Sequence, residues 1–253
     1  MTKKVFASFL LALLLCIPSA YGYTSTPLSD LIGWQDLNNS PSITVGDKIF
    51  YGFTFGYSAP SCASGQTVVT CTWSTSDPAQ IDVVPFFWGN NLGLPGISFQ
   101  GPIGLDLTNY QGNLSSDAVD IRLGYWVTTV SRLPLITDIH QHFTGDAVSG
   151  NITIDEVAMV SGQQVGSSHL SVSPYDPNDP AAEGNDQILL TGAPYTTIQI
   201  QKDIYLSVLK GGNARVSIID QAISQVPEPG FYGALALGLS GLVLAFRRRS
   251  AAK

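Results

Sequence analysis

The chain has 253 residues, and its 12 Lys and Arg are outnumbered by 19 Asp and Glu, which gives a net charge of −7 at pH 7. Hydrophobic residues make up 44% of the chain and charged residues only 12%, a composition too apolar for a disordered protein. The acidic balance repels phosphate backbones and excludes nucleic acid as a partner.

Residues 1–22 are predicted to be a secretory signal peptide. Two lysines precede an apolar stretch, residues 5–17, and small residues occupy the two positions that a signal peptidase reads, Ala20 and Gly22. Cleavage after Gly22 exports the body, residues 23–225, which is long enough for one domain with a hydrophobic core.

The body opens with a predicted short helix and a predicted strand. The helix lies between Pro27 and Trp34, with Ser29 as its cap. The strand follows at residues 49–57, where a period of two places one aromatic row on a single sheet face. The residues of this row are Ile49, Tyr51, Phe53, Phe55 and Tyr57.

Cys62 and Cys71 are predicted to form a disulfide. Cys16 leaves with the signal peptide, so the exported body keeps an even pair in an oxidising compartment. Closing a loop of about ten residues stabilises a fold by roughly 2.5–3 kcal/mol in the chain-entropy account.

The middle of the chain contains a second predicted strand and several candidate aromatic contacts. Residues 119–127 alternate between apolar and polar side chains, as a half-buried strand does. Trp73, Trp88 and Trp126 could stack on sugar rings if they are exposed. The alternative is that these tryptophans belong to the core.

Asp138, His140 and His142 form a candidate metal site. They alternate with less polar residues, so a strand here places all three on one face, where two histidines and a carboxylate can converge on a metal ion. The pair is similar to the His-x-His pair of cupins, although Pro134 and Asp146 depart from the cupin pattern. The alternative is a polar, solvent-facing side of a strand.

Residues 173–186 form a predicted loop that is rich in oxygen ligands. Ca²⁺ takes six to eight such ligands, so the loop is a candidate calcium site, and no other cofactor is expected. Its candidate ligands are Asp176, Asn178, Asp179 and Asp186. Their spacing does not fit an EF-hand, and the alternative is an acidic solvated loop.

The last predicted strands of the body are the most regular. Residues 198–208 place Ile198, Ile200, Ile204, Leu206 and Val208 on one face, with polar residues opposite. A turn at Gly211-Gly212-Asn213 leads to another strand over residues 214–223, which predicts a hairpin. The fold class expected from these elements is all-β, an antiparallel β-sandwich, for which a jelly roll is one fitting arrangement.

Residues 226–253 have the order of a sorting tail. A predicted transmembrane helix over residues 231–246 ends in a cationic stop, which stays on the cytoplasmic side because charge is costly to move through hydrocarbon. The motif before the helix is Pro227, Glu228 and Pro229, and the stop is Arg247, Arg248 and Arg249.

This tail resembles the PEP-CTERM sorting signal of Gram-negative bacteria. The resemblance implies recognition by an exosortase-type membrane protease, membrane anchoring of the precursor, and delivery to the cell surface or to extracellular polysaccharide and biofilm. The body resembles a class of β-rich secreted proteins that often carry this tail. That likeness lies in residues 28–32, residues 43–50 and the closing hairpin, and implies a common fold only.

The sequence contains no Gly-x-Ser-x-Gly elbow, no His-Glu-x-x-His motif and no phosphate loop, so we do not expect an enzyme. The leading expectation is a non-enzymatic surface or matrix protein associated with exopolysaccharide. The first alternative is a carbohydrate-binding module, and the second is a metal-dependent or glycan-cleaving enzyme.

Overall fold

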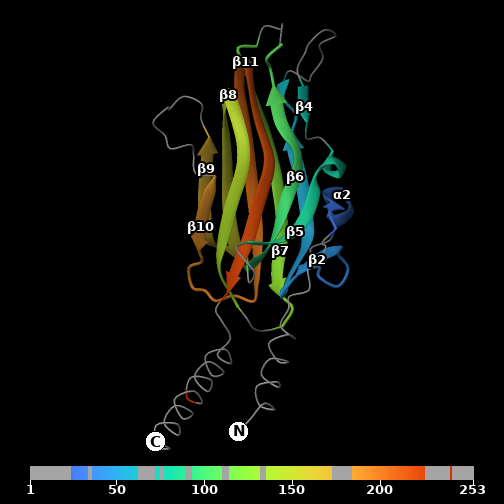
Figure 1. Ribbon diagram of the computed structural model, residues 1–253, viewed down its shortest axis with the longest axis vertical. Helices are drawn as coiled ribbons and strands as arrows, with labels where there is room; N and C mark the ends of the chain where they lie inside the picture. The colour runs from blue at the N-terminus through green and yellow to red at the C-terminus, as the bar shows by residue number, and fades with distance from the viewer. Residues whose placement is uncertain are drawn as a thin grey trace, which may run out of the picture.

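The computed structural model describes residues 24–33, 36–61, 72–74, 77–88, 93–109, 114–131, 135–172, 184–225 and 240 (Figure 1). In chain order the elements are β1 (Thr26–Pro27), α2 (Leu28–Leu31), β2 (Ser42–Val45), β3 (Lys48–Ser58), β4 (Thr72–Ser74), the 3-10 helix η2 (Pro78–Gln80), β5 (Asp82–Trp88), β6 (Leu94–Asp106), β7 (Ser116–Thr129), β8 (Ile136–Val160), β9 (Gln163–Val172), β10 (Asn185–Leu189) and β11 (Thr197–Gln225). All pairings between these strands are antiparallel.

Two long strands, β8 and β11, belong to both layers of the molecule. β8 turns at Ser149 and β11 turns at Gly211, where the backbone φ angles are 52° and 87°. The first arm of β11 pairs with β7 and with the second arm of β8, whereas the second arm of β11 pairs with β6 and with the first arm of β8. Each turn is therefore an arch that carries its strand from one layer to the other.

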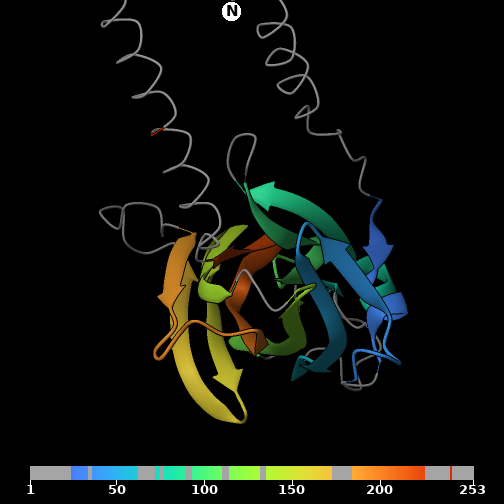
Figure 2. The same ribbon diagram turned by 90° about the horizontal axis from the view of Figure 1, so that it is seen from below.

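The two layers are named here after one member of each. The β7 layer contains β2, β3, β7, the first arm of β11, the second arm of β8, and β9. The β6 layer contains β1, β5, β4, β6, the second arm of β11, the first arm of β8, and β10. The layers face each other and curve around the space between them (Figure 2).

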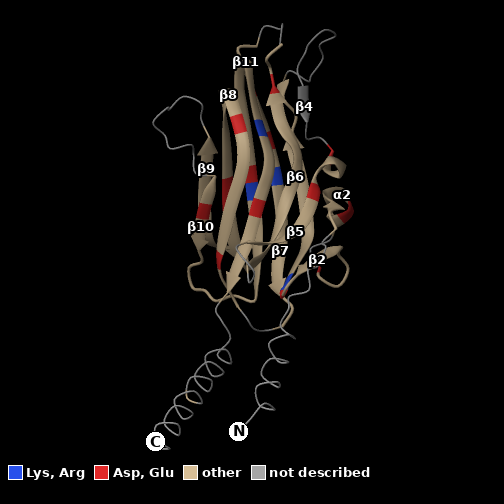
Figure 3. Cartoon of the chain, viewed as in Figure 1, with Lys and Arg blue, Asp and Glu red and all other residues tan. Residues whose placement is uncertain are grey.

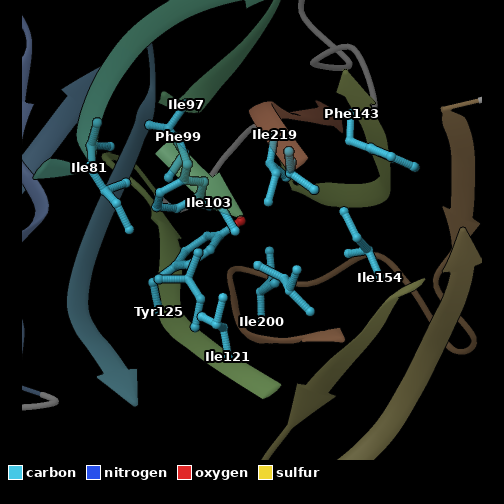
Figure 4. Close-up of a cluster of buried hydrophobic side chains, with 14 of the residues drawn as sticks. Ile81, Ile97, Phe99, Ile103, Ile121, Tyr125, Phe143, Ile154, Ile200 and Ile219 are labelled. Atoms are coloured by element: carbon cyan, nitrogen blue, oxygen red, sulfur yellow. The ribbon is translucent and has the colours of Figure 1, made fainter. Parts of the chain in front are cut away.

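The hydrophobic core fills that space. Ile97, Phe99 and Ile219 point inward from the β6 layer toward Tyr125 and Ile200 of the β7 layer (Figure 4). All five are at most 1% exposed. Burying large side chains between two sheets is the main stabilising contribution in such a sandwich.

The predicted all-β, antiparallel class is confirmed, and so are its two clearest strands. The inward residues of β7 over 119–127 and of β11 over 198–208 are buried as the alternation predicts. The predicted hairpin at Gly211 is wrong in its pairing. A turn is present, but its two arms do not pair with each other. They lie in opposite layers, one beside β7 and the other beside β6, because an inward apolar row on each arm is buried best when the rows face each other.

Two local predictions near the start of the body are also wrong. The aromatic row of β3 does not stay on one sheet face. A bulge between Tyr51 and Thr54, with Gly52 at φ 62°, shifts the inward and outward alternation of the side chains by one residue. Phe50 and Phe53 are therefore the fully buried residues. Ser29 lies inside α2 and not at its cap, which is Pro27. Its hydroxyl donates to the Asp30 carboxylate instead.

The signal peptide and nearly all of the predicted tail lie outside the described residues. Among the residues that are described, we find no helix with the length and apolar character needed to cross a bilayer.

Candidate functional site

An aromatic strip, Phe86 and Trp88, lies on the outer face of the β6 layer. Both side chains project from β5 with ring centroids 6.1 Å apart, and the Trp88 ring meets the imidazole of His142 edge-on at 5.8 Å. His142 belongs to the first arm of β8, with β6 and β11 between it and β5. The indole therefore lies across the intervening strands.

Small residues form the floor under this strip. Phe86, Gly96, Ala222 and His140 stand opposite one another in a single row across four strands. A Cβ atom on Gly96 would clash with the backbone oxygen of Gln221 and lie 2.9 Å from a ring carbon of Phe86, so a larger residue does not fit beneath the ring without a shift of the sheet. Ala222 faces outward by strand alternation and is nevertheless fully buried, as a residue under an aromatic cover is.

A polar edge borders the strip on the β8 side. Its members are Asp138, His140, His142, Asp220 and Gln187. His140 Nε2 lies 3.5 Å from Asp138 Oδ1, and His142 Nδ1 lies 3.4 Å from Asp220 Oδ2. Gln187 Nε2 donates to Asp138 Oδ2 at 2.8 Å. The two imidazoles keep 28% and 32% of their side-chain surface exposed, so part of each ring is accessible to a ligand.

The structure brings the predicted metal ligands onto one face but not to one point. Asp138 and His140 are in contact, whereas His142 pairs with Asp220 instead. Among the described residues, no three His, Cys, Asp or Glu side chains gather as metal ligands. Metal binding by Asp138, His140 and His142 stays a prediction.

Several other predicted residues lie outside the described part of the chain: Cys62, Cys71, Asp176, Asn178, Asp179, Pro227, Glu228, Pro229, Arg247, Arg248 and Arg249. Asp186 is described, and its Oδ1 accepts from the backbone N–H of Gln187. The predicted disulfide, calcium site and membrane stop therefore stay predictions.

Of the two candidate tryptophans whose side chains are described, Trp88 joins the strip and Trp126 does not. The side chain of Trp73 is not described, and Trp126 lies half-buried on β7 in the other layer. Sequence reasoning missed Phe86, Asp220 and Gln187. The alternation of β5, which turns Val83 inward, could have placed Phe86 beside Trp88, but the polar residues come from other strands and depend on register.

A group of carboxylates lies on the opposite outer face, on the β7 layer. Arg122, Asp203, Asp155 and His169 form one row across four strands, and His169 Nδ1 lies 2.6 Å from Asp155 Oδ1. Partial burial raises the pKa of Asp203 to about 6, and a hydrogen bond with Asp120 and the negative charge of Asp120 add to this rise. The neighbouring Arg122 opposes this rise only in part.

We expect Asp203→Asn to stabilise the chain at neutral pH and not in acid. A raised pKa means that the folded state binds the Asp203 proton more tightly than the unfolded state does. The stability that this proton contributes is therefore present below pH 4 and is lost as the pH rises through about 6. Because the Asp203 side chain is nevertheless exposed to solvent, we expect the melting temperature at pH 8 to rise by only about 1–3 °C. Thermal unfolding at pH 4 and pH 8 measures it, and an equal gain at both pH values would contradict the account.

Comparison with known proteins places a sorting motif at the end of the chain. Residues 225–249 match the PEP-CTERM protein-sorting motif, which supports export and sorting to the cell envelope. No curated protein matches the sequence.

Three solved structures show distant likeness to the body. One is TmCBM61 in complex with beta-1,4-galactotriose, at 13% identity and a TM-score of 0.31, covering 63% of this chain and 90% of that one. A second is the enzymatically active domain of Bacteriophage CBA120 tailspike protein 4, at 11% identity and a TM-score of 0.28, covering 68% and 19%. The third belongs to carbohydrate-binding modules of the beta-sandwich super family, at 12% identity and a TM-score of 0.25, covering 70% and 57%. Likeness this distant transfers no function to the chain.

Proposed function

We propose that this chain is an exported, non-enzymatic surface protein whose body binds an extracellular polysaccharide. The binding surface is the outer face of the β6 layer, where the aromatic strip and the polar edge lie side by side. The tail is processed by an exosortase-type membrane protease, which releases the body to the polymer layer.

The observation that carries the proposal is the aromatic strip of Phe86 and Trp88 on an outer sheet face, next to groups that bond hydroxyls. One face of a pyranose ring presents C–H groups that pack on an aromatic plane, while its hydroxyls lie at the ring edge. Carboxylates accept from those hydroxyls, and the Gln187 amide and the imidazoles exchange hydrogen bonds with them. On one sheet face, the aromatic strip offers a surface for stacking and the polar edge offers hydrogen-bond partners for hydroxyls.

The charge of the face narrows the class of polymer. Acidic positions outnumber basic ones on the layer that faces the viewer in Figure 3, and the whole chain carries −7. Such a surface repels polyanions, so the ligand class that fits is a neutral polysaccharide. The PEP-CTERM motif supports delivery to the place where such polymers accumulate outside the cell.

Binding of the full-length chain to a panel of immobilised neutral and anionic polysaccharides tests the proposal. We expect retention on at least one neutral polymer, competed by the same polymer in solution and insensitive to a chelator. Equal or stronger retention on anionic polymers, or no retention on any neutral one, would refute it. Shortening of the bound polymer during incubation would show a glycan-cleaving enzyme instead.

A further inference from the structure

Five polar side chains lie together inside the apolar core. They are Lys202, Glu156, Gln141, Gln221 and Tyr125, and none is more than 2% exposed. Lysine and glutamate are almost never buried so completely unless they are paired. This buried polar cluster is separate from the aromatic strip, which lies on the outer face of the β6 layer.

Strand register places the cluster across both layers. Lys202 and Glu156 stand opposite each other on β11 and β8 in the β7 layer, and Gln141 and Gln221 stand opposite each other on the other arms of the same two strands in the β6 layer. The two pairs face each other across the sandwich. The arches of β8 and β11 therefore bring one cross-strand pair over the other.

Hydrogen bonds connect the members into one network. Lys202 Nζ donates to Glu156 Oε2 and to Gln141 Oε1. Gln221 Nε2 donates to the other carboxylate oxygen of Glu156, and Tyr125 donates its hydroxyl proton to Gln221 Oε1. The Lys202 amine thus touches both a carboxylate and an amide carbonyl, with no water between them.

The surroundings favour a neutral amine at Lys202. Burial lowers the pKa of Lys202, and the charge and hydrogen bond of Glu156 offset that effect only in part. Proton transfer from Lys202 Nζ to Glu156 removes both charges from a site where charge is costly. A neutral amine in contact with an amide carbonyl brings a nucleophile and an electrophile together, as acyl transfer requires.

We propose that Lys202 and Gln141 are joined by an intramolecular amide bond, formed within the folded body with Glu156 as the proton shuttle. The bond ties the β7 layer to the β6 layer through their side chains.

The reaction balances without any co-reactant. The lone pair of Nζ attacks Cδ of Gln141, the Nζ–Cδ bond forms and the Cδ–Nε2 bond breaks. Glu156 gives its proton to the leaving nitrogen and takes one back from Nζ, so that ammonia leaves and the acid is restored. Gln141 Nε2 donates to Ser168 Oγ at 3.4 Å, which points the leaving nitrogen toward β9, a strand whose only pairing among the described strands is with β8.

Mass spectrometry of the reduced, denatured full-length chain tests the bond. We expect a chain lighter by one ammonia molecule than its sequence requires. Trypsin should cut after Arg132 and Lys210 but not after Lys202, giving a fragment 133–210 that retains the deficit. Chymotrypsin should then cut after Phe143 without separating the peptides that hold Gln141 and Lys202.

The chain contains its own comparison and a decisive variant. Lys48 Nζ also contacts a glutamine, Gln225, and a carboxylate, Asp47, but Asp47 is 27% exposed, so we expect trypsin to cut after Lys48. Glu156→Gln should restore the full mass and cleavage after Lys202. A wild-type chain with an intact Lys202 amine, or one in which Lys202 is joined to Glu156 with loss of water, would overturn the proposal even if the variant fails to fold.

Discussion

Replacing Lys202 by methionine should lower the free energy of unfolding by about 3–5 kcal/mol, because it removes the proposed bond between the layers and leaves Glu156 and Gln141 buried without the partner that both contact. Glu156 is fully buried, and its remaining partner in the cluster is the neutral amide of Gln221. Methionine keeps most of the volume of lysine, so a cavity contributes little to the loss. Chemical denaturation followed by tryptophan fluorescence measures the change.

A double variant separates the unpaired Glu156 side chain from the other effects of the substitution. Lys202→Met combined with Glu156→Met removes both polar groups, and we expect it to regain the part of the loss that comes from burying Glu156 without Lys202. Lys210→Met, on the same strand but exposed, should change stability by no more than about 0.5 kcal/mol. A double variant as unstable as the single one would show that the unpaired Glu156 side chain is not a cause of the loss.

Replacing Trp88 by alanine should weaken polysaccharide binding by about 30-fold, equivalent to about 2 kcal/mol. The loss has two sources. The stacking plane disappears, and His142 loses the aromatic ring that it contacts. Trp88→Phe keeps an aromatic plane and should retain part of the affinity. Calorimetric titration with the polymer retained in the panel measures these differences.

The matched control for Trp88 is Tyr205→Ala. Tyr205 is an aromatic residue with 42% exposure, and it lies on β11 in the other layer, away from the strip. Its loss should leave the affinity unchanged. If Tyr205→Ala weakened binding as much as Trp88→Ala did, the loss at Trp88 would not identify the β6 layer as the binding face, and the proposed surface would be wrong.

Sequence periodicity predicted the strands well where one face is uniformly apolar. Residues 198–208 are the clearest case, because every inward position but one is aliphatic. The exception, Lys202, is visible in the sequence as a charge in phase with Ile200 and Ile204. Its partners could not be read from the pattern, because they depend on the register between β8 and β11.

For the candidate binding face, the sequence predicted which residues share a strand face but not which residues from other strands they contact. Alternation correctly placed Asp138, His140 and His142 on one strand face, but it could not show that His142 faces Asp220 and meets Trp88. Those contacts depend on how the curved layer brings β5 and β8 together. The bulge at Gly52 and the arch at Gly211 escaped prediction for a related reason: a glycine permits positive φ without saying which way the chain then turns.

The central position of β11 determines how the body responds to tension on its C-terminal end. Residues 213–225 run between β6 and β8 and are hydrogen-bonded to both, with Gln225 at the end where the tail continues. A pull along this arm loads both ladders in shear, so many bonds must give way together instead of unzipping one after another. The body would therefore resist extraction of its last strand when a force acts on its C-terminal end.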